Sequence, residues 1–220
     1  MKVTLVSSSQ PSTELVAQGI VNAQELVAYC ARVSNPANQT NTDTSEKLIR
    51  YLIKHKHWSP LEMVSACLEI ETTRDIARQI LRHRSFSFQE FSQRYAVADL
   101  GWEFKETRLQ DTKNRQNSIA TDDHMLDYEW QTVQQNLVAQ VQTAYDWAIK
   151  NGIAKEQARA VLPEGITTSR LYMQGTLRSW LHYIELRSGP ETQKEHREVA
   201  MACADALESI FPMVKEFLVN

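Results

Sequence analysis

Residues 64–72 alternate strictly between apolar and polar side chains, and this period of two predicts a half-buried strand. Its inward face would carry Val64, Ala66, Leu68 and Ile70. The period then changes to that of a helix, whose apolar stripe comprises Ile76, Ala77, Ile80 and Leu81. The sequence therefore predicts a strand that leads directly into a helix, capped by Thr73 and running from Arg74 to about Arg84.

Comparable patterns predict the remaining elements. We expect short strands at residues 2–6 and 171–175. We expect amphipathic helices at residues 22–33, 44–53, 126–152, 176–187 and 192–217. The third is marked by apolar residues between 126 and 148 and ends at Gly152, and the last is broken before Pro212. Residues 34–43 are rich in turn formers and residues 99–123 are polar and aperiodic, which predicts a loop and a long excursion. The order of elements indicates a single α+β domain over residues 1–220, with a small antiparallel sheet flanked by long helices.

Composition narrows the possible classes of protein. The 220 residues, 42% of them hydrophobic and 23% charged, are typical of a globular protein with a substantial core. The formal net charge of −3 argues against a general polyanion-binding surface. Cys30, Cys67 and Cys203 form no CxxC pair, so neither a disulfide framework nor a structural zinc site is expected. No apolar run resembles a signal peptide or approaches the ~20 residues of a membrane span, and we expect a cytoplasmic location.

Positive charge is concentrated in one segment, which reads RHRSFSFQEFSQRY from Arg82 to Tyr95. Between Arg74 and Arg94 there are five arginines and two acidic residues. Guanidinium groups are fork-shaped, permanently charged donors that suit phosphate groups. We therefore expect a site for a small anionic ligand here, with Arg74 on a solvated face. Ser92 is expected to bind ligand, because no base and orienting group accompany it as a nucleophile would require.

Two other functions remain compatible with these residues. Arginines interleaved with aromatic residues are typical of single-stranded nucleic-acid binding, although the phenylalanines here are more typical of a core. The aromatic residues concerned are Phe86, Phe88, Phe91 and Tyr95. His55 and His57 are compatible with a metal-dependent nucleotide phosphohydrolase, although an HxH pair alone is a weak metal signal and no resident metal is predicted. Neither GxGxxG nor GxxxxGK[ST] occurs, so a Rossmann site and a P-loop are unsupported.

The arginine-rich segment resembles the signature of the flavin-dependent thymidylate synthases, the ThyX family, whose pattern is close to RHRxxSxNxxSxRY. Gln89 replaces the usual Asn. Three further segments resemble elements of that family, namely HKHWSPLEM at residues 55–63, ARAVLP at 158–163 and LRSWLHYIELR at 177–187. Met63 replaces a usual His, and Thr176 a common Asn. The resemblance extends from about Val21 to Phe217.

This resemblance implies the fold of that family and a homotetramer in which several subunits build each active site. The implied reaction methylates dUMP to dTMP. Methylenetetrahydrofolate would supply the carbon, and NADPH would reduce a bound FAD, so that no protein nucleophile is needed. The implied partners are therefore dUMP, folate and NADPH, with no nucleic acid and no membrane.

The resemblance also assigns site residues by position. Arg187 would activate the uracil ring. The residues that would contact dUMP are Gln79, Ile80, Leu81, Arg82, Glu90, Phe91, Ser92, Gln93, Arg94, Arg159 and Arg187. Those that would contact FAD are Ser59, Arg82, His83, Arg84, Glu90, Thr176, Leu177, Arg178 and His182. His57 would lie near the flavin or folate, whereas His124 and His196 are expected only in surface or capping positions.

Overall fold

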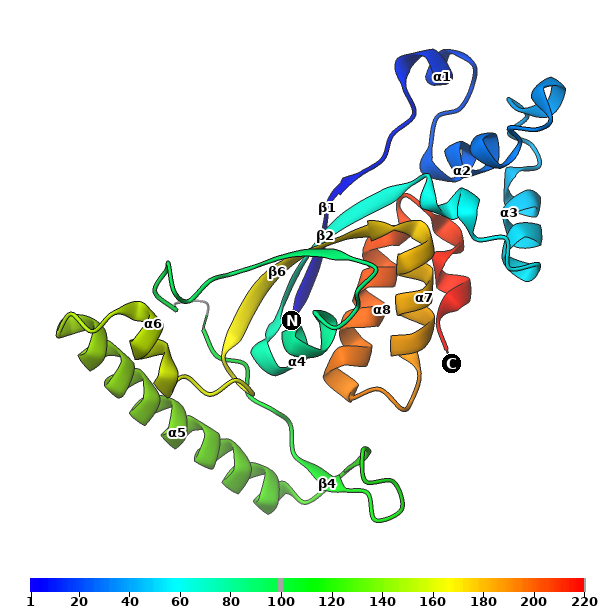
Figure 1. Cartoon of the computed structure of the whole chain (residues 1–220). Helices are drawn as coiled ribbons and strands as arrows, with labels where there is room; N and C mark the ends of the chain where they lie inside the picture. The colour runs from blue at the N-terminus through cyan, green and yellow to red at the C-terminus, as the bar shows by residue number, and fades with distance from the viewer. Residues whose placement is uncertain (99–100, 220) are drawn as a thin grey trace. The chain divides into compact units, whose positions relative to one another are not determined.

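The computed structural model describes residues 1–98 and 101–219. Residues 99 and 100, the first of the predicted excursion, lie outside the described residues. The elements in chain order are β1 (Lys2–Ser8), α1 (Thr13–Ala17), α2 (Ala23–Ala31), η1 (Pro36–Asn38), α3 (Ser45–Lys54), η2 (Ser59–Glu62), β2 (Ser65–Thr73), α4 (Arg74–Ile80), β3 (Ser87–Glu90), β4 (Arg108–Gln110), β5 (Ser118–Ala120), α5 (His124–Lys150), α6 (Lys155–Ala158), η3 (Arg159–Val161), β6 (Thr168–Thr176), α7 (Leu177–Ser188), α8 (Lys194–Glu208) and η4 (Pro212–Phe217). The predicted α+β class, with helices and a small antiparallel sheet, is confirmed (Figure 1).

The main sheet has four strands in the order β1-β2-β6-β3. By compactness the chain divides into two units. The first comprises Met1, residues 71–82 and residues 90–171, and the second comprises residues 2–70, 83–89 and 172–220. The boundary therefore falls within β2, β3 and β6.

The second unit contains the strand that the alternating pattern predicts. Val64, Ala66, Leu68 and Ile70 are all buried, as expected for the inward face of β2. Helix α7 bonds to β2 and to the residue directly before it: Trp180 Nε1 donates to the Ala66 carbonyl at 3.1 Å, and the Leu177 backbone N–H donates to the Val64 carbonyl at 2.9 Å. Helices α7 and α8 lie side by side (Figure 1), and α8 also packs on β1. The core of this unit therefore forms between the sheet and these two helices.

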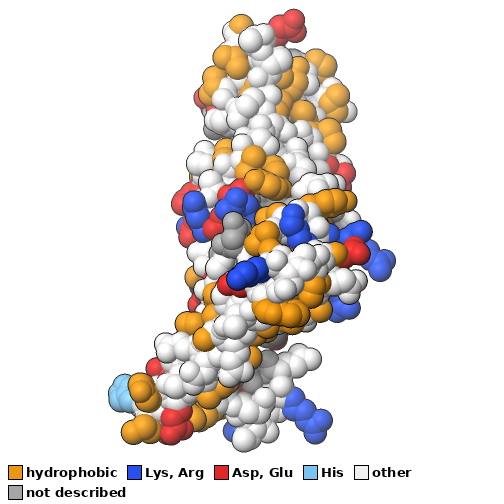
Figure 2. Space-filling model, turned by 90° about the vertical axis from the view of Figure 1, so that its left-hand side faces the viewer, with side chains coloured by type: hydrophobic (Ala, Val, Ile, Leu, Met, Phe, Trp, Pro, Cys, Tyr) orange, Lys and Arg blue, Asp and Glu red, His pale blue; other side chains and the backbone are white. Residues whose placement is uncertain are grey.

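The first unit is built around α5, which begins two residues before the predicted helix and ends at Lys150, shortly before the predicted stop at Gly152. Asp123 caps its beginning by accepting bonds from the backbone N–H groups of Met125 and Leu126. A small core forms where Tyr145 and Ala148 of α5 meet Ala158 of α6. Much of the apolar stripe of α5 stays exposed, however, and hydrophobic side chains are visible on the face shown in Figure 2. Among the described residues, no helix is both long enough and apolar enough to cross a membrane.

Two predicted segments differ from the structure. Helix α4 ends at Ile80 rather than near Arg84, because the Arg82 N–H bonds to the Gln79 carbonyl in a tight closing turn. The expected excursion contains an antiparallel hairpin, β4–β5, in which Leu109 pairs with Ile119. The predicted break before Pro212 is confirmed: α8 ends at Glu208 and η4 begins at Pro212, which lacks the N–H that a continuous helix needs. The short elements α1, β3 and α6 were not predicted, because each has too few residues to show a period.

A glycine in β6 allows a close contact within the second unit. A Cβ atom on Gly175 would lie 2.4 Å from the ring of Phe86, well inside contact distance. The same ring packs edge-on against Trp180, with ring centroids 4.8 Å apart. Phe86 is buried, which confirms that it belongs to the core rather than to a stacking surface. The absence of a side chain at residue 175 therefore lets the segment after His83 pack against the sheet.

Substitution of Gly175 by alanine tests this contact. We expect Gly175→Ala to lower the free energy of unfolding by about 1–3 kcal/mol, because the added methyl group displaces a buried ring. Gly165→Ala is the matched control, since a Cβ atom there meets nothing within 4 Å. Urea unfolding of both variants measures the difference. Equal stability of the two would show that Phe86 accommodates the methyl group.

Candidate active site

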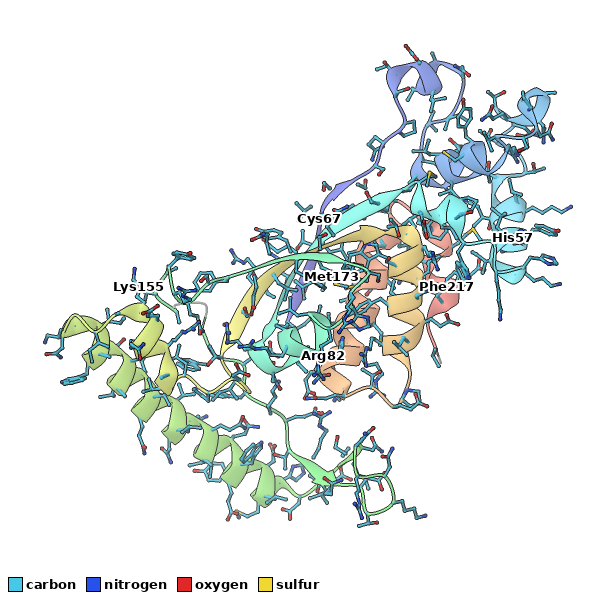
Figure 3. All side chains as sticks on the ribbon, in the orientation of Figure 1. His57, Cys67, Arg82, Lys155, Met173 and Phe217 are labelled. Atoms are coloured by element: carbon cyan, nitrogen blue, oxygen red, sulfur yellow. The ribbon has the colours of Figure 1, made fainter. Side chains whose placement is uncertain are left out.

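The RHR segment begins directly after α4. Arg82 and Arg84 are both exposed, and neither forms a salt bridge within the described part of the chain. Figure 3 marks Arg82 just beyond the end of α4. Two permanently charged groups without acidic partners are suited to an anionic ligand, because no internal ion pair has to be broken when the ligand binds.

Glu90 is held by two side chains of the first unit. Arg74 NH1 lies 3.5 Å from Glu90 Oε1, and Ser169 Oγ donates to the same oxygen at 3.0 Å. Arg74 is only 8% exposed, so the expected solvated face for this residue is wrong. A buried guanidinium requires a charged or polar partner, and Glu90 provides one. Both bonds fall on one oxygen, and this arrangement orients the carboxylate.

Two of the arginines assigned to dUMP lie close to one residue, Glu156. Arg94 Nε is 3.7 Å from the Glu156 carboxylate, and Arg159 Nε donates to the Glu156 carbonyl at 3.3 Å. Lys155 also reaches this cluster, as its Nζ donates to the Tyr95 carbonyl at 3.0 Å. Sequence reasoning did not single out Lys155 or Glu156. Their position just before the ARAVLP segment was the one sequence signal that could have placed them near the site.

The other residues assigned to dUMP follow α4 and β3. Ile80 and Gln93 are buried, whereas Gln79, Leu81, Phe91 and Ser92 are half-buried. The Phe91 N–H bonds to the Arg170 carbonyl at 2.8 Å, and the Ser92 carbonyl accepts from both Tyr95 and Ala96 in a tight turn. The Ser92 hydroxyl oxygen accepts the Arg94 N–H at 3.4 Å, and no imidazole or carboxylate beside it acts as a base within the described residues. This setting agrees with a binding role for Ser92.

Residues assigned to FAD meet in the second unit, where η2 packs on α7. Arg178 on α7 forms an ion pair with Glu62 of η2, which begins at Ser59. One turn further along α7, the His182 ring meets Trp58 edge-on, with centroids 4.4 Å apart. Burial lowers the pKa of His182, and the charge of Arg178 lowers it further. His182 is therefore neutral at physiological pH.

Thr176 and Leu177 have local structural roles. Thr176 is the N-cap of α7, and its hydroxyl oxygen accepts the Ser179 N–H at 3.3 Å. Leu177 is 1% exposed and packs in the core. Neither observation places a flavin contact at these side chains, and the assignments at both positions stay predictions.

Arg187, in the last turn of α7, is bonded to the RHR segment. Its Nε donates to His83 Nε2 at 2.9 Å. The edge of the His83 ring meets Tyr183, at a centroid distance of 4.9 Å and an interplanar angle of 85°. The Tyr183 hydroxyl in turn lies 3.1 Å from Nε2 of His196. The structure thus brings together two predicted site residues that are 104 positions apart.

His196 differs from its expected surface or capping position, because it is completely buried on α8. Burial lowers its pKa to about 3, and the charges of Arg187 and His83 act in the same direction. The pKa of His83 is lowered to about 4, first by burial and then by Arg187. Both imidazoles are neutral at physiological pH. A single histidine on a long helix gives no indication of its burial, so sequence alone could not have identified this one.

The remaining histidines give no support for a metal site. His55 and His57 are exposed, with ring centroids 6.2 Å apart. Among the described residues, no three His, Cys, Asp or Glu side chains are grouped so that they could hold a metal ion. The three cysteines are free thiols, and Cys203 is buried.

Comparison with known proteins points to the same family as the sequence motifs. Residues 14–213 match the family described as "Thymidylate synthase complementing protein". The "Probable flavin-dependent thymidylate synthase" of Paramecium bursaria Chlorella virus 1 is 47% identical over 218 residues, which cover 99% of each chain. The "Flavin-dependent thymidylate synthase" of Synechocystis sp. is 47% identical over 215 residues, covering 97% of each. The solved structure of the UMP/dUMP methylase PolB from Streptomyces cacaoi, bound with 5-Br dUMP, has a TM-score of 0.80 at 26% identity and covers 98% of this chain and 93% of that one.

Fold, site and comparisons define an enzyme of the α+β class whose cationic groups suit a nucleotide. The chain belongs to the family of flavin-dependent thymidylate synthases. The resemblance found in the sequence is therefore confirmed, as is the expectation of an enzyme. The family match supports the thymidylate synthase over the two other functions compatible with the sequence, a nucleic-acid binder and a metal-dependent phosphohydrolase.

The buried histidines predict a stability that depends on pH. The unfolded chain takes up a proton at each histidine below about pH 6.5, whereas His196 stays neutral in the folded chain down to about pH 3. The contribution of neutral His196 to the free energy of unfolding is fully present above pH 6.5 and is lost as the pH falls towards 3. We expect the free energy of unfolding to fall by roughly 1 kcal/mol per pH unit for this group. Urea unfolding at several values between pH 7.5 and pH 4.5 measures it.

His196→Gln should be less stable than wild type at pH 7.5 and should show a shallower dependence on pH. Part of the dependence should remain, because His83 has a lowered pKa as well. His124→Gln, at an exposed position, should reproduce the wild-type profile. A profile of His196→Gln parallel to that of wild type would contradict a neutral buried imidazole at this position.

Proposed function

We propose that this enzyme methylates dUMP reductively to dTMP, using FAD, methylenetetrahydrofolate and NADPH. The observation that carries the proposal is the 47% identity along 99% of both chains to a protein named as a probable flavin-dependent thymidylate synthase. The 5-Br dUMP bound to PolB, a structural neighbour, supports a uracil nucleotide as the substrate.

Binding of the nucleotide is assigned to the cations of the first unit. Arg94 and Arg159 lie around Glu156, and together with Arg82 they would hold the phosphate through charge-assisted hydrogen bonds. Glu90, oriented by Arg74 and Ser169, would accept a hydrogen bond from a sugar hydroxyl. Binding energy gained at the phosphate and sugar would orient the uracil ring for reaction.

Activation of the uracil is assigned to Arg187. C5 of uracil is a poor nucleophile unless negative charge on the ring is stabilised. A fixed guanidinium at the ring edge stabilises that charge, and in a partly desolvated site this effect amounts to about 3 kcal/mol, or roughly two powers of ten in rate. Arg187 is half-buried and anchored through Nε, so its terminal nitrogens remain available for the ring.

The residues assigned to FAD fit the chemistry of that cofactor. Arg84 and Arg178 offer the donors that a pyrophosphate requires, and neutral His182 offers an aromatic face and a polar ring edge. The proposed set is completed by Ser59, Arg82, His83, Glu90, Thr176 and Leu177. When bound, the flavin supplies the redox chemistry of the methylation, with NADPH as the reductant and the folate as the carbon source. Ser92 binds ligand and forms no covalent bond in this scheme.

The proposed assembly is a homotetramer whose subunits together build each active site, in one domain per chain. The family match extends without a break over residues 14–213, which include parts of both units. The exposed apolar residues of α5 support association, because a soluble monomer seldom leaves such a face uncovered. A groove of about 840 Å³ lies along this helix, with Ala144 and Trp147 on one wall and Ile153 and Val161 on the other.

The proposed location is the cytoplasm, where the substrates occur.

Removal of Arg187 tests the proposed chemistry. We expect Arg187→Ala to keep bound FAD while its kcat for dTMP falls about 100-fold or more, because the developing charge on uracil loses its partner. Flavin absorbance per polypeptide and dTMP formation are measured on the same preparation. Arg197→Ala, on α8, is the matched control and should keep near-normal turnover.

Near-normal turnover of Arg187→Ala would refute the activating role of this residue. A wild-type protein that is colourless and takes up no FAD would refute the proposed function as a whole.

The assembly is tested on α5. Trp147 is 61% exposed and lines the groove, so Trp147→Glu should shift the protein from a tetramer towards smaller species without unfolding it. Gln135→Glu adds the same charge at an exposed polar position of α5 and should leave the assembly intact. Light scattering after size exclusion measures the mass. A wild-type protein that is monomeric would contradict the proposed assembly.

A further inference from the structure

The bond between Arg187 and His83 determines which nitrogen of the imidazole carries the proton. A guanidinium Nε–H is always a donor, so the His83 Nε2 at 2.9 Å has to be an acceptor with a free lone pair. In a neutral imidazole the proton then resides on Nδ1. The two nitrogens of His83 are therefore distinct, and one of them is committed to Arg187.

The surroundings of His83 hold its ring in this orientation. Tyr183, 1% exposed, meets the ring edge-on at 4.9 Å, and its hydroxyl is bonded to the buried His196. Both of these groups lie on adjacent helices, α7 and α8, so they cannot shift without moving the core. On its other side, His83 is followed by Phe86, which is buried against Trp180. The imidazole is thus constrained by packing at both ends of its segment.

His83 can accept the hydrogen bond from Arg187 only while its imidazole is neutral. A protonated imidazole would offer Arg187 an N–H instead of a lone pair and would place two positive charges side by side. Burial, followed by the charge of Arg187, lowers the pKa of His83 to about 4, so the acceptor form persists at physiological pH.

An arginine has four flexible side-chain torsions, and anchoring Nε restricts most of them. The two terminal NH₂ groups then point away from the anchor in a fixed fork. A misplacement of a reacting or activating group by about 1 Å typically lowers a rate about 100-fold, so the position of this guanidinium matters for catalysis. We propose that His83 is a positioning residue, which accepts through Nε2 the Nε–H of Arg187 and so aims the guanidinium at the uracil ring. This inference rests on the proposed function, because the role of Arg187 belongs to it.

Two amide substitutions separate the nitrogens of His83. A glutamine side chain places its amide close to the position of imidazole Nε2, whereas an asparagine amide lies close to Nδ1. We expect His83→Gln to keep kcat within about 10-fold of wild type, because the amide oxygen can accept from Arg187. We expect His83→Asn to lose about 100-fold in kcat with little change in the KM for dUMP, as the anchor is lost while the nucleotide contacts remain. Bound FAD and the melting temperature of each variant show whether it is loaded and folded.

The opposite order, with His83→Asn active and His83→Gln inactive, would overturn the proposal and assign the function to Nδ1. Equal losses in two folded, flavin-loaded variants would also overturn it, since they would show that the ring acts only by packing.

A second measurement does not depend on catalysis. Nitrogen-15 NMR of the protein labelled at its six histidines should show an unprotonated Nε2 for His83, assigned from the signal that His83→Gln lacks. This signal should move in Arg187→Lys, in which the donor is changed. A protonated Nε2, or a signal insensitive to Arg187→Lys, would overturn the proposal. If the wild-type protein forms no dTMP while the NMR result is as expected, the proposed function fails and the contact between the two residues stands.

Discussion

The packing of Phe86 against Gly175 is the contact on which the hydrogen bond between His83 and Arg187 depends. Phe86 reaches Trp180 and the sheet only because residue 175 carries no Cβ atom. Because the chain is anchored at residue 86, His83 is held three residues before it and meets Tyr183 and Arg187. The neighbouring arginine, Arg84, remains exposed on the same short segment. The packing of Phe86 thus holds the ring of His83 against the core while the adjacent Arg84 faces solvent.

Electrostatics divides the arginines of the chain into two groups. Arg74 and Arg178 have carboxylate partners, and Arg74 is buried with Glu90. Arg82 and Arg84 have no such partner within the described residues. The buried Arg74 orients the carboxylate of Glu90, whereas Arg82 and Arg84 can receive an anion without an ion pair being broken. Arg187 belongs to neither group, since its partner is a neutral imidazole that restrains it without cancelling its charge.

Under the proposed function, this distinction would allow the enzyme to bind a dianionic nucleotide and still activate a neutral ring. A carboxylate beside Arg187 would neutralise the positive charge that the proposed reaction requires. A neutral acceptor keeps that charge in full, and burial of the imidazole ensures that the acceptor stays neutral. The buried Tyr183–His196 pair fits the same requirement, because it fixes the ring without adding a charge beside the guanidinium.

The sequence by itself determined the strand at β2, the long helix α5, the helix α7, and the motif that identifies the family. These features are local: a period of two or 3.6 residues reports burial along one element, and motif residues lie close together in the chain. Only the tertiary structure decided that Arg74 and His196 are buried, that His83 bonds to Arg187, and that residues 108–120 form a hairpin. The physical reason is that burial and hydrogen bonding of a polar side chain depend on a partner distant in sequence, and nothing in the local pattern specifies that partner.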